Sequence, residues 1–160
     1  MKSFLILLFI PFIGFSQISF SDIMRLNSLD KFKRLVIEND FEYESNDDDW
    51  LIYGFNIVKD SLEGNKSSKW AYYNTKDNRF ALSFSRTTAL GSLFGVDEKM
   101  ASNPYDRIVA DIKKKCKYYK IINYKGTDYV AYSCSGSSYK GKIGFVVSEG
   151  SGIIRHFVKY

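Results

Sequence analysis

The sequence is poor in the residue types on which most catalytic and metal sites depend, with one His, two Cys and two Pro among 160 residues. These residues cannot assemble a closed zinc site if the two Cys pair with each other. A Ser or Cys nucleophile would have only His156 as its base. The run Asp47-Asp48-Asp49 lacks the ligand spacing of a calcium loop and fits a solvated turn. The sequence therefore predicts no catalytic residue, no metal site and no cofactor.

Long apolar runs are also missing after residue 17. The one such run, Phe4–Phe15, follows a single Lys and ends at Ser16, which is the pattern of a secretory signal peptide. It is shorter than the ~20 residues that span a bilayer, and Pro11 interrupts it. We expect residues 1–16 to be cleaved before Gln17, a secreted or periplasmic location, and no transmembrane segment in the mature chain. An uncleaved N-terminal anchor is the alternative.

The two Cys favour one disulfide in a chain that is expected to be exported. Strand-like segments at 118–122 and 129–133 flank a turn at Lys125-Gly126. Folding them as a hairpin brings Cys116 opposite Cys134, or nearly so. Closing a loop of this size stabilises a fold by roughly 3 kcal/mol. Two buried, reduced thiols are the alternative.

The apolar spacing changes between helical and strand-like periods along the chain. A short helix that begins at Ser21 and a second helix at Leu29–Glu38 precede four strands. After a connection at 87–95 the order begins again, with a short helix at 97–101, a helix from Pro104 and four more strands. The eight predicted strands are 41–44, 51–58, 69–74, 79–85, 118–122, 129–134, 142–147 and 153–158.

The repeated order predicts an internal duplication. A shift that lays Met24 on Met100 also lays Asn27 on Asn103 and aligns the apolar faces of the two longer helices. With the equal strand count, it predicts an α+β fold of two tandem helix-loop-helix plus four-stranded antiparallel sheet units. The units would be 17–95 and 96–160, packed as one compact domain. One irregular α+β domain is the alternative.

Two tandem units of this kind resemble the architecture of the secreted β-lactamase inhibitory proteins. A single unit is similar to the small lipoprotein component of the outer-membrane barrel-assembly machinery. The resemblance covers nearly the whole mature chain and rests on element order and repeat length. It implies a secreted, inhibitor-like or accessory binding protein. The chain departs from both families, because the inhibitors carry more disulfides and the acylated Cys of the lipoprotein is missing here.

Charge is divided unevenly in this chain of net charge +5. Acidic side chains slightly outnumber basic ones in residues 17–100, whereas basic side chains dominate residues 101–160. The excess gathers at Lys113, Lys114, Lys117 and Lys120, a block that can steer an acidic protein or an anionic lipid or glycan of the cell envelope. A solvated helix end is the alternative. Nucleic acid is not an expected partner, because no binding motif for it is present.

Aromatic residues are abundant, with 12 Tyr, 13 Phe and 2 Trp, and rings exposed on one sheet face would form a protein-binding patch. Core packing is the alternative for any single ring. We therefore predict a non-enzymatic binding protein whose partner is a protein. An envelope protein that binds anionic lipid or glycan and a small hydrolase that uses His156 are the other hypotheses. The predicted binding residues are Trp50, Trp70, Tyr72, Tyr73, Lys113, Lys114, Lys117 and Lys120, and the further aromatic candidates are Tyr118, Tyr124 and Tyr139.

Overall fold

The computed structural model describes residues 17–60, 62, 64–86 and 103–158. The predicted signal peptide, the connection at 87–95 and the short helix at 97–101 lie outside these residues. The described helices are α1 (Phe20–Arg25), α2 (Leu29–Glu38) and α4 (Pro104–Lys115). The described strands are β1 (Phe41–Asp47), β2 (Trp50–Phe55), β3 (Lys69–Asn74), β4 (Arg79–Ser85), β5 (Lys117–Tyr124), β6 (Thr127–Ser133), β7 (Lys142–Ser148) and β8 (Ser151–Phe157).

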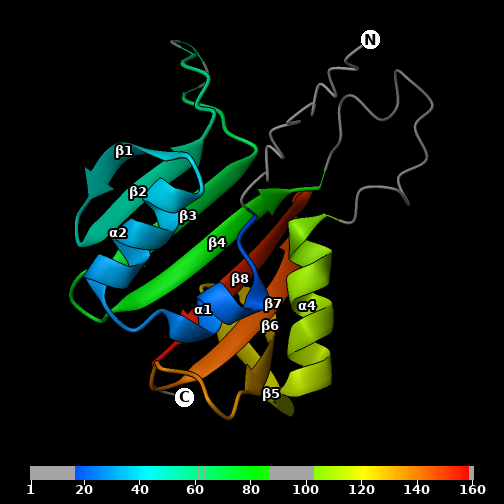
Figure 1. Cartoon of the computed structure of the whole chain (residues 1–160). Coiled ribbons are helices and arrows are strands. Elements are labelled where there is room, and N and C mark those ends of the chain that lie inside the picture. Colours follow the sequence, from blue (N-terminus) through cyan, green and yellow to red (C-terminus); the bar gives the residue numbers. More distant parts are fainter. Residues whose placement is uncertain (1–16, 61, 63, 87–102, 159–160) are drawn as a thin grey trace, which may run out of the picture.

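All eight of these strands form one antiparallel sheet in the order β1-β2-β3-β4-β8-β7-β6-β5 (Figure 1). Strands β4 and β8 pair at the centre, from Ala81 opposite Arg155 to Ser85 opposite Ser151. The predicted α+β fold of two helix-loop-helix plus four-stranded units is therefore wrong. The chain is mostly a single eight-stranded antiparallel sheet with a few short helices.

The error has a physical cause, since a strand's periodicity reports which of its sides is buried but not which strand lies beside it. Both β4 and β8 would be edge strands in separate units, and each would present a row of unpaired backbone groups. Phe80, Leu82 and Phe84 of β4 and Ile154 of β8 belong to the same core cluster. Pairing the two strands satisfies both edges and joins the two apolar faces.

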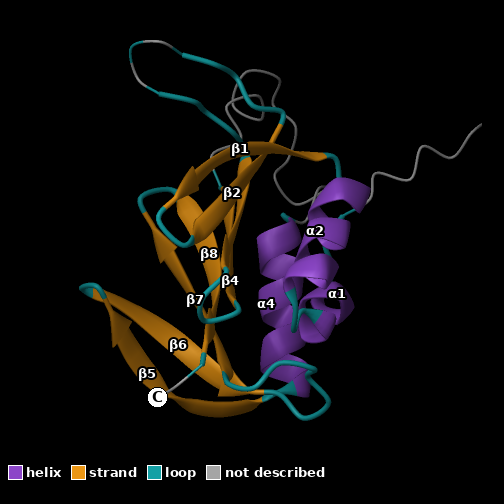
Figure 2. Cartoon of the chain, turned by 90° about the vertical axis from the view of Figure 1, so that its left-hand side faces the viewer, coloured by secondary structure: helices purple, strands orange, loops and turns teal. Residues whose placement is uncertain are grey.

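The three described helices lie on one side of the sheet, which we call the covered face (Figure 2). Helix α2 has the predicted bounds and buries Phe32, whose ring centre lies 4.9 Å from that of Tyr73 and 5.8 Å from that of Tyr53. Fully burying one such ring stabilises the fold by about 1.5–3 kcal/mol. Helix α1 begins at Phe20, one residue earlier than predicted, because Ser19 rather than Ser21 forms the capping box with Asp22.

Helix α4 begins as its sequence predicts, with Pro104 in the first turn and the side chain of Asn103 accepting a hydrogen bond from the Tyr105 amide at 3.0 Å. The ring of Tyr105 lies flat over Gly152 of β8, where an added Cβ would come within 2.5 Å of it. Only glycine leaves room for the helix to approach the sheet so closely.

A disulfide joins Cys116, which follows α4, to Cys134, which follows β6, with the sulfur atoms 2.11 Å apart. The pairing of Lys117 with Ser133 in the adjacent ladder sets the two cysteines opposite each other. The predicted pairing is confirmed, and the bond fits folding in an oxidising compartment. Within the described ranges, no helix has the length and apolar character needed to cross a membrane.

Candidate functional site

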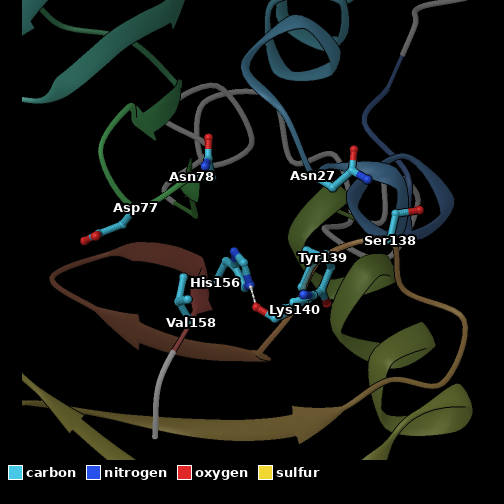
Figure 3. A pocket seen from close by; sticks show the side chains of 8 residues that line it. All are labelled: Asn27, Asp77, Asn78, Ser138, Tyr139, Lys140, His156 and Val158. Atoms are coloured by element: carbon cyan, nitrogen blue, oxygen red, sulfur yellow. Dashed lines mark hydrogen bonds between the residues drawn. The ribbon is translucent and has the colours of Figure 1, made fainter.

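One hollow of the molecule surrounds the single histidine. It has a volume of about 300 Å³ and lies where the loop before β7 meets the turn between β3 and β4 (Figure 3). Its lining residues are Asn27, Asp77, Asn78, Ser138, Tyr139, Lys140, His156 and Val158.

His156 is only 3% exposed and lies against two rings, with centroids 5.3 Å from Phe80 and 4.3 Å from Tyr139. Its Nε2 donates a hydrogen bond to the Lys140 carbonyl at 3.0 Å. Burial lowers the pKa of His156 to about 4, against the opposing effect of backbone carbonyls at Lys140 and Asn78. The imidazole is therefore neutral at neutral pH, because its charged form would lose hydration.

The hollow does not hold a catalytic triad. In Figure 3 the carboxylate of Asp77 points away from His156, and the hydroxyl of Ser138 points to the opposite side. Ser138 and Asp77 make no hydrogen bond to the imidazole in the described structure; its Nε2 bonds instead to a backbone carbonyl. A general base must reach the proton that it removes, and in this structure no hydroxyl or carboxylate of the hollow is hydrogen-bonded to the imidazole.

The opposite side of the sheet, which we call the open face, carries a different set of rings. No described helix lies over it (Figure 2). Most of these rings are only partly buried, while Tyr129 and Phe157 are buried among their neighbours on the same face. By register, the open face includes Glu42, Asp47, Trp50, Ile52, Gly54, Trp70, Tyr72, Arg79, Ala81, Ser83, Lys117, Lys120, Ile122, Tyr124, Tyr129, Ala131, Ser133, Lys142, Gly144, Val146, Ile153, Arg155 and Phe157.

Three of the four aromatic residues predicted to bind a partner meet on this face. Trp50, Trp70 and Tyr72 come from the neighbouring strands β2 and β3. Tyr73 does not join them, because successive side chains of a strand point to opposite faces. It is 1% exposed in the core, and its hydroxyl donates to Oδ1 of Asn78 at 2.9 Å. The prediction that Tyr73 belongs to the surface patch is wrong.

The further aromatic candidates separate in the same way. Tyr139 is buried, and its hydroxyl meets the sulfur of Met24 at 3.8 Å. Burial raises the pKa of Tyr139 well above its usual range. Tyr118 is exposed on β5 and packs edge-on against Tyr132, whose own ring belongs to the covered face. Of these three, only Tyr124 lies on the open face.

The open face is concave. The ring centres of Trp50 on β2 and Tyr124 on β5 lie 5.7 and 4.5 Å from the same guanidinium carbon, that of Arg155. In a flat sheet the six strand spacings of about 4.8 Å between β2 and β5 would separate them by about 29 Å. Two side chains cannot close such a gap, so the sheet itself curves around the middle of this face.

Arg155 therefore lies at the centre of the hollow face, with rings around its guanidinium group. A third ring, that of Tyr129, has its centre 5.9 Å away. The guanidinium carbon of Arg79 also lies 5.8 Å from the Trp50 ring centre, but Arg79 pairs with Asp77. Burial raises the pKa of Tyr72, an effect that Arg155 opposes and Glu44 reinforces. Tyr72 thus remains a neutral hydroxyl beside a positive charge.

The predicted basic block is divided between the two faces. Lys113 and Lys114 are exposed on α4, and the amine of Lys113 lies 5.6 Å from the Phe145 ring centre on the covered side. Lys117 and Lys120 pair with Ser133 and Ala131, whose side chains share the open face. The structure therefore brings only Lys117 and Lys120 toward the aromatic patch.

The acidic run ends β1 and forms the turn to β2, where Asp48 has a positive φ of 50°. Residues 17–60, 62, 64–86 and 103–158 contain no group of three His, Cys, Asp or Glu side chains that could hold a metal ion.

Sequence reasoning missed Arg155, Tyr129 and Phe157, which complete the centre of the open face. The signal in the sequence was the segment Ile153–Phe157 of β8, in which the side chains that point to either face of the sheet are large. A strand with one solvated face normally shows small or polar residues there. Large residues on both sides indicate a second surface, although they do not identify its neighbours.

Comparison of the chain with protein-family models, with curated proteins and with solved structures finds no match. The resemblance to the inhibitory proteins thus stays a prediction, and the geometry of the open face carries the functional proposal.

Proposed function

We propose that the chain is an exported, non-enzymatic binding protein that captures a protein partner on its open face. The observation that carries the proposal is the concave surface, over which no described helix lies (Figure 2), where Trp50, Trp70 and Tyr72 are only partly buried and the Trp50 ring lies beside Arg155. Trp, Tyr and Arg are the residues in which binding energy concentrates at protein interfaces. The disulfide supports export, because such bonds persist in oxidising compartments.

A pull-down from envelope and culture-fluid fractions tests the proposal. The baits to be compared are the unchanged protein and a double variant, Trp70→Ala/Tyr72→Ala. Tyr43→Ala is the matched control, because Tyr43 is 57% exposed and pairs with Tyr53 of the covered face. We expect one protein to be captured by the unchanged and Tyr43→Ala baits and lost from the double variant. Equal capture by all three baits would contradict the proposal.

The envelope alternative predicts a different response to salt. Capture of anionic lipid or glycan through Lys113, Lys114, Lys117 and Lys120 would collapse as salt screens exposed charges beyond about 8–10 Å. Burial of aromatic rings persists under the same conditions. Retention of the partner at high salt would favour the open face, and its loss would favour the envelope alternative.

A further inference from the structure

We propose that Arg155 is the anchor of the open face and binds a carboxylate on an acidic, protruding loop of the partner protein. This inference rests on the proposed function and names the chemistry of the partner. It places the recognition of charge at the bottom of the concave face, away from the exposed lysines of α4.

The rings hold the guanidinium without consuming its hydrogen-bond donors. Tyr124, Trp50 and Tyr129 lie 4.5, 5.7 and 5.9 Å from its central carbon. The negative face of an aromatic ring attracts a cation that lies over it. The N–H groups of arginine lie in the guanidinium plane as a fixed fork. A ligand with two oxygen atoms can therefore accept from the fork while the rings remain in place.

Within the described residues, no carboxylate forms an ion pair with Arg155, although Glu42 and Asp47 of the edge strand β1 share the open face. Three of the other arginines have acidic partners: Arg34 pairs with Glu38, Arg79 with Asp77 and Arg86 with Asp106. The side chain of Arg155 makes no ion pair or hydrogen bond to another described residue, and its Nε is buried without a partner. A partly buried cation is costly unless an anion pairs with it. A carboxylate from outside the chain would supply that pair.

The shape and charge of the face favour a protein loop over a membrane. A flat bilayer cannot reach the bottom of a surface that curves from β2 to β5, whereas a protruding loop can. Trp70 and Tyr72 would contact apolar side chains beside the carboxylate. Lys142, whose amine donates to Ser133 at 3.0 Å, adds positive charge on the same face near Lys117 and Lys120. These charges complement an acidic loop.

Selection of a defined probe tests the inference. Disulfide-closed 12-residue peptides displayed on phage are selected on the purified protein, and the affinity of synthetic copies is measured by calorimetry. We expect the peptides to share an Asp or Glu beside an aromatic or aliphatic residue. Arg155→Gln should weaken their binding by roughly 10- to 100-fold, because a hydrogen-bonded charge pair is lost. Arg155→Lys should bind the peptides with an affinity between those of the unchanged protein and Arg155→Gln, because lysine keeps the charge but lacks the planar fork of N–H donors.

A double-mutant cycle separates a direct contact from a general disturbance. Replacing the peptide carboxylate by its amide should cost as much as Arg155→Gln, and the two changes together should cost little more than either. Arg107→Gln, on the exposed side of α4, is the matched control and should change nothing. Losses that simply add would show that Arg155 acts only through the shape of the face, and would overturn the inference.

The remaining outcomes distinguish the inference from the function on which it rests. If Trp70→Ala abolishes peptide binding but Arg155→Gln does not, the protein-binding face stands and the carboxylate anchor is wrong. If neither change matters, or no selected peptide depends on this face, both proposals fail. Arg155-dependent binding to phosphatidylglycerol vesicles, without peptide binding, would assign the site to lipid and overturn the acidic loop.

Discussion

The two faces of the sheet carry the same residue types in different environments. On the covered face, Tyr73 and Phe80 are at most 1% exposed and pack against helices and one another. On the open face, Trp70 and Tyr72 are only partly buried. Tyr72 and Tyr73 are neighbours in the chain and yet face opposite environments. The difference shows that the helices packed on one face, rather than the composition of the strands, decide which rings become fully buried.

The largest effect should come from breaking the covered face. Phe32→Ala should lower the free energy of unfolding by about 3–5 kcal/mol, because it removes a fully buried ring and leaves a cavity. Phe32 is 0% exposed on the buried side of α2. Urea denaturation measures the change, with Ile37→Ala on the 67% exposed side of α2 as the control. A loss below about 1 kcal/mol would mean that the helix layer does not hold this face.

Removing the disulfide should have the next largest effect. Replacing Cys116 and Cys134 together by Ser opens a loop with a sequence separation of 18. The unfolded chain gains conformational freedom, so the free energy of unfolding should fall by roughly 3 kcal/mol. Unfolding of the unchanged protein with and without a reductant provides the control. Equal stability in the two states would show that packing alone joins α4 to β6.

Acid should weaken the covered face through His156. The pKa of His156 is about 4 in the fold, against 6.5 for the unperturbed side chain. Between these values the unfolded chain binds the additional proton, so stability should fall as the pH drops from 6.5 to 4. Each pKa unit corresponds to about 1.4 kcal/mol, which gives a loss on the order of 3 kcal/mol.

His156→Gln, which can still donate to the Lys140 carbonyl, isolates this effect from the titration of carboxylates. Urea unfolding of both proteins at several pH values should show a shallower decline for the variant. Phe80, Tyr139 and Arg79 face the imidazole and remain unchanged in the comparison. Parallel declines would mean that His156 is not the responsible group.

The smallest stability effect is expected on the open face. Trp70→Ala should lower the free energy of unfolding by about 1 kcal/mol, because the ring is only partly buried. It covers Gly54, where an added Cβ would come within 2.9 Å of it. Thermal unfolding, compared with Phe32→Ala, measures the contrast between the faces. A loss as large as that of Phe32→Ala would show that the open face is structural.

The sequence predicted the helices and strands well where local signals are strong. Helix α2 has its predicted bounds because the apolar spacing and the Ser28 cap agree. The turn at Lys125-Gly126, where both residues have positive φ, set the hairpin and with it the Cys116–Cys134 pair. The junction of β4 with β8 was not predictable, because it joins strands far apart in the chain and no turn fixes their register.

The candidate site was partly predictable for the same reason. The sequence shows large rings in strands at Trp50, Trp70 and Tyr72. It could not show that Tyr73 is buried instead, because alternation does not say which face the helices cover. Arg155 could not be recognised at all. Its significance depends on rings from β2, β5 and β6, which only the curvature of the complete sheet brings together.

The sequence by itself determined the local elements, the hairpin that carries the disulfide and the scarcity of catalytic side chains. Neighbouring residues fix dihedral preferences, caps and turns, so these features are written within short segments. The tertiary structure alone decided that eight strands share one sheet, which face stays open and where Arg155 lies. Those outcomes depend on pairing and burial between distant segments, which a local pattern does not record.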